Sequence, residues 1–212
     1  MRRTLLLIPG VLATVAFAVI VLVGLPQVML RRVEAPAGLE AYTPGQLRGR
    51  HIYIANGCFY CHSQQLRDPA FTTDVDRGWG PRATVPGDYV YDRPHLLGTM
   101  RTGPDLIDVG ARLPSREWHL IHLYDPRMLV PWSIMPAFPY LFEEKDSAAL
   151  RPGDVVVPVN GPRAPRGRLV VATADALALV DYLLSLRRDY PLPGAAGETR
   201  AAAGEPTGPT SP

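Results

Sequence analysis

The longest apolar segment of the chain is Thr4–Leu30, a run of 27 residues without a charged side chain. Pairs of arginines border it at residues 2–3 and 31–32. A helix of this length exceeds the ~30 Å hydrocarbon core of a bilayer. A cleaved signal peptide, with a small-residue site near residues 16–18, is the alternative, but the apolar region of such a peptide is only ~7–15 residues long. We therefore expect residues 1–32 to form a single transmembrane anchor.

Helix start and stop signals follow a short polar linker, residues 33–42. Thr43 is a good N-cap residue, and Pro44 suits the first helical position because its missing N–H has no partner there. The helix is predicted to run to Asn56. Gly57 then occupies the position where a left-handed residue ends a helix. This pattern predicts a helix whose C-terminal end is followed directly by Cys58.

Two further helices are predicted in the second half of the chain. Ser115 caps a short helix that stops before Pro126. Thr173 caps a longer helix with apolar residues at helical spacing, and Pro191 closes it. Arginines at residues 187–188 suit the negative end of the helix dipole. These segments, with the anchor, predict a mainly α-helical protein.

A smaller β-element is expected between these helices. Valine-rich segments at 155–159 and 169–171 flank Asn160-Gly161, which suggests a small β-hairpin insertion. The 23 prolines are spread through the middle of the chain and indicate many loops. Residues 193–212 are rich in Pro, Gly, Ala and Thr, and we expect a disordered tail there. One globular domain is therefore expected over residues 43–192.

Charge and cysteine content exclude several classes of protein. The net charge is +2, and the basic residues are scattered instead of forming a stripe, so a nucleic-acid-binding surface is not expected. The two cysteines are close neighbours in the sequence, so they do not form the disulfide framework of a small secreted domain. Their role is expected to be local.

The cysteines form the sequence Cys58-Phe59-Tyr60-Cys61-His62. This is the C-x-x-C-H pattern of covalent c-type haem attachment, in which both thiols bond the haem and the adjacent histidine binds iron. A redox-active Cys-x-x-Cys and half of a zinc site are the alternatives. Zinc needs about four ligands, and no second cysteine pair exists; a thioredoxin-like site expects a βαβ context, which is not found here. The motif predicts one covalent haem c with His62 as a metal ligand.

A six-coordinate iron needs a second ligand from downstream, and methionine paired with histidine raises the reduction potential. The candidates are Met100, Met128 and Met135. Met135 lies in a proline-stiffened loop, residues 133–139, that could hold a thioether without regular structure around it. We favour Met135.

Other candidate residues carry weaker signals. His119 and His122 share one face of a predicted helix, so either could be a rival axial ligand or half of a metal site, although a structural role is favoured. Arg101 could pair with a haem carboxylate, and the sequence Gly103-Pro104 allows a close turn.

Five separate motifs, taken together, resemble the mono-haem subunit II of cbb3-type cytochrome c oxidase, called CcoO or FixO. They occur in the family's order after a single N-terminal anchor, and the resemblance covers residues 1 to about 142. The motifs are Gly57-Cys-x-x-Cys-His62-Ser63-Gln64, Val90-Tyr91-Asp92-x-Pro94, Arg101-Thr-Gly-Pro-Asp-Leu106, Trp118-His119-x-x-His122-Leu-Tyr-x-Pro126-Arg127 and Met135-Pro136.

The resemblance implies a class I cytochrome c fold on the periplasmic face of a bacterial inner membrane. It implies His62 and Met135 as axial ligands, with Gly103 and Pro104 packed against the proximal side of the haem. Electrons would come from a di-haem cytochrome c subunit or a soluble cytochrome and pass to a haem-copper catalytic subunit, which reduces oxygen. The chain itself would transfer electrons and leave the catalysis to that subunit.

The sequence departs from the family's usual pattern after Leu141, so two alternatives stay open. One is the corresponding electron-transfer subunit of a related nitric oxide reductase. The other is a free-standing anchored electron shuttle. The linker, residues 33–42, reaches only about 35 Å even when fully extended, which favours docking on one partner.

Overall fold

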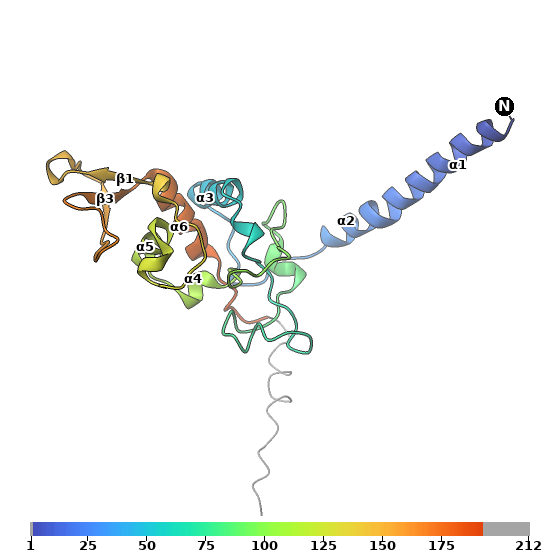
Figure 1. Cartoon of the computed structure of the whole chain (residues 1–212). Helices are drawn as coiled ribbons and strands as arrows, with labels where there is room; N and C mark the ends of the chain where they lie inside the picture. The colour runs from blue at the N-terminus through green and yellow to red at the C-terminus, as the bar shows by residue number, and fades with distance from the viewer. Residues whose placement is uncertain (1, 193–212) are drawn as a thin grey trace, which may run out of the picture.

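The computed structural model describes residues 2–192, so the tail predicted at residues 193–212 lies outside the described residues. The chain begins with a straight helical rod that projects away from the rest of the molecule (Figure 1). Its three parts are α1 (Arg2–Val19), a π-helical turn (Ile20–Gly24) and α2 (Leu25–Leu30).

The rod is a candidate membrane span. The stretch Leu7–Leu30 has a mean hydropathy of 2.6 over its most apolar part, and none of that part is buried against the protein. Pro26 lies in the first turn of α2, where a missing N–H disrupts least. Within residues 2–192, one helix, near the N-terminus, is long and apolar enough to cross a bilayer.

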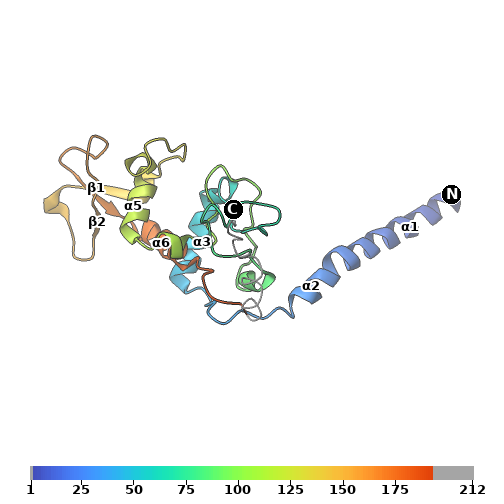
Figure 2. The ribbon, with the colours of Figure 1, turned by 90° about the horizontal axis from the view of Figure 1, so that it is seen from below.

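Four helices build the domain beyond the linker. They are α3 (Pro44–Ala55), α4 (Val109–Arg112), α5 (Arg116–Tyr124) and α6 (Ala174–Ser185). The sheet, α5, α6 and α3 follow one another along the molecule, and the rod stands at the opposite end from the sheet (Figures 1 and 2). Single 3₁₀ turns connect the elements at Cys58–Tyr60, Pro86–Tyr89, Pro126–Met128, Pro139–Leu141 and Ser147–Ala149.

Helices α3 and α6 pack closely because α3 carries a glycine at the contact. A Cβ atom on Gly49 would lie 1.9 Å from the carbonyl oxygen of Ala178 in α6. Apolar side chains of α3, α5 and α6 meet in one core cluster, which includes Tyr53, Leu120 and Leu179. Cys58 and Met135 are partly buried and pack against this cluster.

The predicted helix caps are confirmed. The Thr43 hydroxyl accepts a hydrogen bond from the backbone N–H of Gln46 at 3.2 Å, and the Gln46 side chain accepts one from the Thr43 N–H at 2.8 Å. Gly57 adopts the left-handed conformation with φ of +67°. Ser115 and Thr173 also cap their helices through side-chain hydrogen bonds. Local signals therefore define where α3, α5 and α6 begin.

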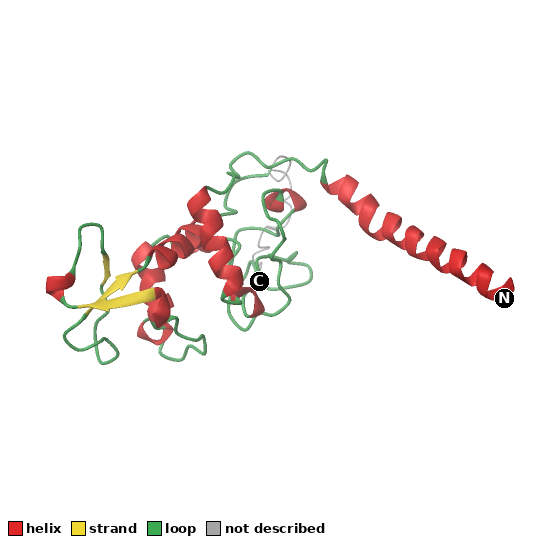
Figure 3. Cartoon of the chain, turned by 90° about the horizontal axis from the view of Figure 1, so that it is seen from above, coloured by secondary structure: helices red, strands yellow, loops and turns green. Residues whose placement is uncertain are grey.

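The β-hairpin prediction was incomplete, because the sheet has three strands. They are β1 (Phe142–Lys145), β2 (Val155–Val157) and β3 (Leu169–Ala172), ordered β1-β3-β2 with both pairs antiparallel (Figure 3). Ala172 pairs with Phe142 on one side and with Val155 on the other. Strand β1 was missed because its Glu-Glu-Lys sequence lacks the β-branched residues that signal a strand.

The prediction for the end of α6 was wrong. The helix ends at Ser185, well before Pro191. Arg188 is only 1% exposed and does not cap the helix dipole. Its guanidinium donates to the carbonyl of Asp88 at 3.0 Å, and its backbone N–H donates to the Asp108 carboxylate at 2.6 Å. Asp88 and Asp108 lie far from Arg188 in the sequence. The chain leaves the helix before Arg188, and these hydrogen bonds stabilise the non-helical path that it takes.

Candidate functional site

A cavity of about 510 Å³ lies between α3, α5, α6 and the loops around residues 103 and 135. This volume is within the range of pockets that bind small molecules and cofactors. Most of the lining is apolar, and it includes Leu106, Val109, Leu113, Leu123, Val130, Phe138, Leu179 and Leu183. Among the residues predicted from the sequence, the cavity brings together Cys58, Cys61, His62, Gly103, Pro104 and Met135.

The two cysteines reach the cavity from the turn that follows α3. Gly57 reverses the chain, and the Tyr60 N–H then donates to the Gly57 carbonyl at 2.9 Å. The His62 N–H donates to the Cys58 carbonyl at 3.0 Å, which fixes the five-residue motif as a compact loop. Both cysteines are free, and burial raises the pKa of Cys58 to about 11. The Cys58 thiol is therefore protonated near neutral pH.

His62 is held by the loop that contains Gly103 and Pro104. Its Nδ1 donates a hydrogen bond to the Pro104 carbonyl at 2.8 Å. A Cβ atom on Gly103 would lie 2.2 Å from the His62 ring, so only glycine fits this position. Burial lowers the pKa of His62, which favours the neutral ring. With Nδ1 engaged, Nε2 is the nitrogen left to bind a metal.

Met135 lies on a loop braced by one arginine. The Arg127 guanidinium donates to the carbonyls of Ser133 and Met135 at 3.2 and 3.0 Å. The Phe138 N–H donates to the Leu123 carbonyl of α5 at 2.9 Å and closes the loop. Of the other candidate methionines, Met100 is 57% exposed and Met128 packs against the core, and neither lines the cavity.

His119 and His122 also line the cavity, from α5. His119 is buried, and its Nε2 is hydrogen-bonded to the Leu113 carbonyl at 2.9 Å. His122 stacks on Trp118 with ring centroids 4.6 Å apart, and burial lowers its pKa to about 4. Within residues 2–192, no three His, Cys, Asp or Glu side chains are grouped to hold a metal ion. The contacts of His119 fit the structural role favoured from the sequence.

Arg101 does not line the cavity. Its guanidinium forms an ion pair with Asp74 and donates to the Ser63 hydroxyl and the Gln65 carbonyl. These contacts engage all three of its nitrogens. These contacts do not support the prediction that Arg101 pairs with a haem carboxylate, which stays a prediction.

Arg112 lines the cavity and was missed from the sequence. Its pKa is lowered by burial, and its buried Nε has no hydrogen-bond partner in the described part of the chain. The Tyr53 hydroxyl and His122 Nδ1, also on lining residues, are similarly buried and unpaired. Buried polar atoms are normally hydrogen-bonded, so these three fit a cavity that holds a ligand with polar groups. Of the three residues, only His122 was a candidate from the sequence; no sequence pattern singled out Tyr53 or Arg112.

Comparison with known families found a match over most of the chain. The family model described as cytochrome c oxidase, mono-haem subunit/FixO matches residues 1–157, about three quarters of the chain. The match extends beyond the last recognised motif and ends with β2, before β3 and α6. No curated protein matches the sequence. The chain therefore belongs to the FixO family of mono-haem cytochrome c oxidase subunits.

Proposed function

We propose that this chain is a membrane-anchored mono-haem cytochrome c that relays electrons to the catalytic subunit of a cbb3-type oxidase. The main support for this proposal is that Cys58, Cys61, His62 and Met135 all line one largely apolar cavity. In the proposal, Cys58 and Cys61 bond one haem c, and His62 and Met135 are the axial ligands. The contact between α3 and α6 beside this cavity supports a class I cytochrome c-like domain over residues 43–192.

The bound haem would supply one-electron redox chemistry, and the protein would orient it and set its potential. The Pro104 carbonyl holds the His62 ring through Nδ1 and leaves Nε2 as the nitrogen that would bind the iron. Arg112 is the residue best placed to pair with a haem carboxylate, because a lining guanidinium with an unpaired buried nitrogen needs a polar partner. Apolar lining residues exclude water, and Arg127 holds the Met135 loop in place.

The linker supports attachment to one partner over a freely swinging shuttle. The Tyr42 hydroxyl donates to the Asp92 carboxylate at 3.1 Å, which fastens the end of the linker to the domain. A Cβ atom on Gly87 would lie only 3.1 Å from the Glu34 carbonyl oxygen, so the start of the linker also lies against the domain. The linker between the rod and α3 is thus held against the domain near both of its ends, and its reach is shorter than that of a free linker.

The proposed partners follow from the family. The oxidase family implies association with a haem-copper catalytic subunit, and a di-haem cytochrome c subunit or a soluble cytochrome is the proposed donor. The apolar rod would anchor the chain in a bacterial inner membrane, with the domain on the periplasmic face.

The test is to purify the tagged full-length chain from its native membranes in mild detergent. We expect a haem b and copper-containing subunit to co-purify, together with oxygen consumption. Turnover of nitric oxide in place of oxygen would assign the chain to a reductase. A cytochrome recovered alone in every mild detergent would contradict the proposed subunit role.

A further inference from the structure

The segment that follows His62 runs beside the loop that supports the His62 ring. Two backbone hydrogen bonds join them: the Gly103 N–H donates to the Cys61 carbonyl at 3.0 Å, and the Leu106 N–H donates to the Ser63 carbonyl at 2.9 Å. These bonds place the Pro104 carbonyl opposite His62 Nδ1. A side chain that holds these two segments together therefore also holds the Pro104 carbonyl in place against His62.

Asp105 connects the two segments from inside the protein. Its side chain is completely buried. One carboxylate oxygen accepts from the Ser63 hydroxyl at 2.5 Å and from the Gln65 N–H at 2.8 Å, and the other accepts from the Ile107 N–H at 2.8 Å. A single carboxylate therefore binds residues on both sides of the contact.

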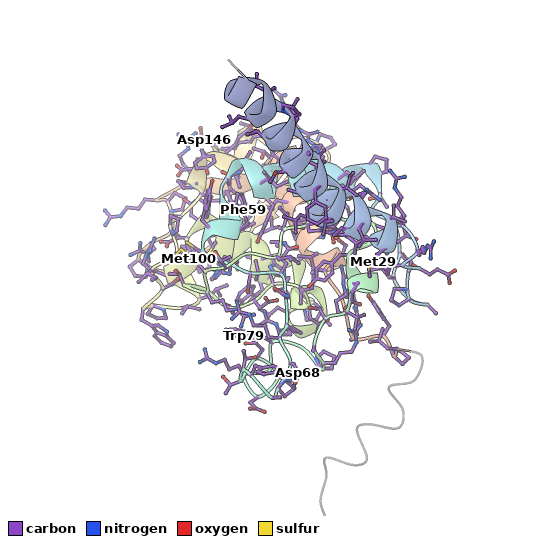
Figure 4. The ribbon with its side chains drawn as sticks, turned by 90° about the vertical axis from the view of Figure 1, so that its right-hand side faces the viewer. Met29, Phe59, Asp68, Trp79, Met100 and Asp146 are labelled. Atoms are coloured by element: carbon purple, nitrogen blue, oxygen red, sulfur yellow. The ribbon has the colours of Figure 1, made fainter. Side chains whose placement is uncertain are left out.

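Arg101 completes the connection from the other end of the loop. Its guanidinium donates to the Ser63 hydroxyl at 3.0 Å and to the Gln65 carbonyl at 2.5 Å. It lies 3.8 Å from Asp105, pairs with the buried Asp74, and packs over the Trp79 ring. Trp79 lies in the loop-rich part of the domain, away from Asp146 at the sheet end (Figure 4). Arg101 and Asp105 thus flank residues 102–104 and hold both ends of that turn.

We infer that Arg101 and Asp105 form a clamp that positions the Pro104 carbonyl on His62 and thereby sets the reduction potential of the haem. They are positioning residues, because neither lines the cavity. A carbonyl that accepts from Nδ1–H makes histidine a more basic ligand, and a more basic ligand favours the oxidised iron. Loosening the clamp should weaken this hydrogen bond and raise the potential. The inference rests on the proposed haem.

Charge alone predicts a different result, which makes the clamp testable. Replacing Arg101 with an uncharged residue removes a positive charge, and by electrostatics this should lower the potential. The clamp predicts the opposite sign. Ser63→Ala changes no charge, so any shift that it causes comes from the lost hydrogen bonds.

The experiment is a redox titration of the full-length chain and its Arg101→Gln and Ser63→Ala variants, purified with their partners. Both variants should raise the potential, by a three- to tenfold change in the reduction equilibrium; tenfold is 59 mV for one electron. Electron paramagnetic resonance of the oxidised haem should show changed g values, because the His62 ring is less constrained. If Arg101→Gln does not accumulate, Arg101→Lys keeps the charge but loses the planar set of donors, and it should also raise the potential.

The matched control is Asp92→Asn, which removes a buried carboxylate paired with Arg50, far along the chain from His62. It should reduce stability and change the potential less than Arg101→Gln does, because its partners Arg50 and Tyr42 lie outside the clamp. An unchanged or lowered potential in the Arg101 variant would overturn the inference. A wild-type chain without covalent haem would instead refute the proposed function, so the two failures are distinguishable.

Discussion

Replacing Gly103 with alanine tests the proposed support of the His62 ring. The added methyl carbon would lie 2.2, 2.7 and 2.8 Å from Cε1, Nδ1 and Nε2 of His62. No Cβ atom fits at these distances, and the obstacle is a ring that is itself hydrogen-bonded to Pro104. Either the ring or the loop must move.

The cost has two parts. Forcing an extra carbon into a packed site costs about 1–3 kcal/mol, and losing the His62–Pro104 hydrogen bond costs about 1 kcal/mol more. A total of about 2–4 kcal/mol corresponds to a melting temperature lower by roughly 4–16 °C, using about 2–4 °C per kcal/mol for a chain of this size. Covalent haem content should fall as well, because a displaced His62 no longer orients the motif.

The assay is thermal melting in detergent, combined with haem staining of the denatured chain. Gly45→Ala is the matched control, because its Cβ would meet only the Thr43 hydroxyl at an ordinary 3.9 Å. It should leave both measurements close to those of the wild type. A Gly103→Ala protein with wild-type melting temperature and haem content would show that residue 103 does not constrain the His62 ring.

Four further substitutions probe the axial ligand, haem attachment, the contact between α3 and α6, and the pH dependence of stability. Met135→Ala should keep covalent haem but lower the potential and remove the methionine-sulfur charge-transfer band, whereas Cys61→Ala should impair attachment itself; an unchanged spectrum in the first variant removes Met135 as a ligand. Gly49→Ala should prevent stable folding, because the new methyl would overlap the Ala178 carbonyl, and wild-type expression and melting would contradict this packing. His122, with a pKa of about 4 in the folded protein, binds fewer protons than its unfolded form below pH ~6.5, so stability should fall as the pH drops toward 4, by up to about 3 kcal/mol. His122→Phe should flatten that decline in melting temperature, and an unchanged pH profile would count against it.

Local signals in the sequence predicted the elements that depend on near neighbours. Thr43 and Gln46 are three residues apart and form the cap of α3 without help from the rest of the fold. Gly57 needs only its own backbone freedom to end that helix. The cysteine motif is also local, so its place after α3 could be predicted from the sequence.

Contacts between distant residues could not be predicted in the same way. Strand β1 exists because it pairs with β3, which comes more than twenty residues later. The sequence shows that Arg101 is positively charged, but it does not show which carboxylate lies beside it. In the folded chain, that carboxylate is the side chain of Asp74. Arg112 was missed for a related reason. The sequence does not show that the Nε of Arg112 is buried without a hydrogen-bond partner.

The proposed function requires one covalent haem on Cys58 and Cys61. The intact mass of the denatured, tagged chain, purified from its native membranes, measures this attachment. We expect the mass of the polypeptide plus one haem, with loss of normal attachment in Cys61→Ala. A wild-type chain with the mass of the polypeptide alone would contradict the proposed function.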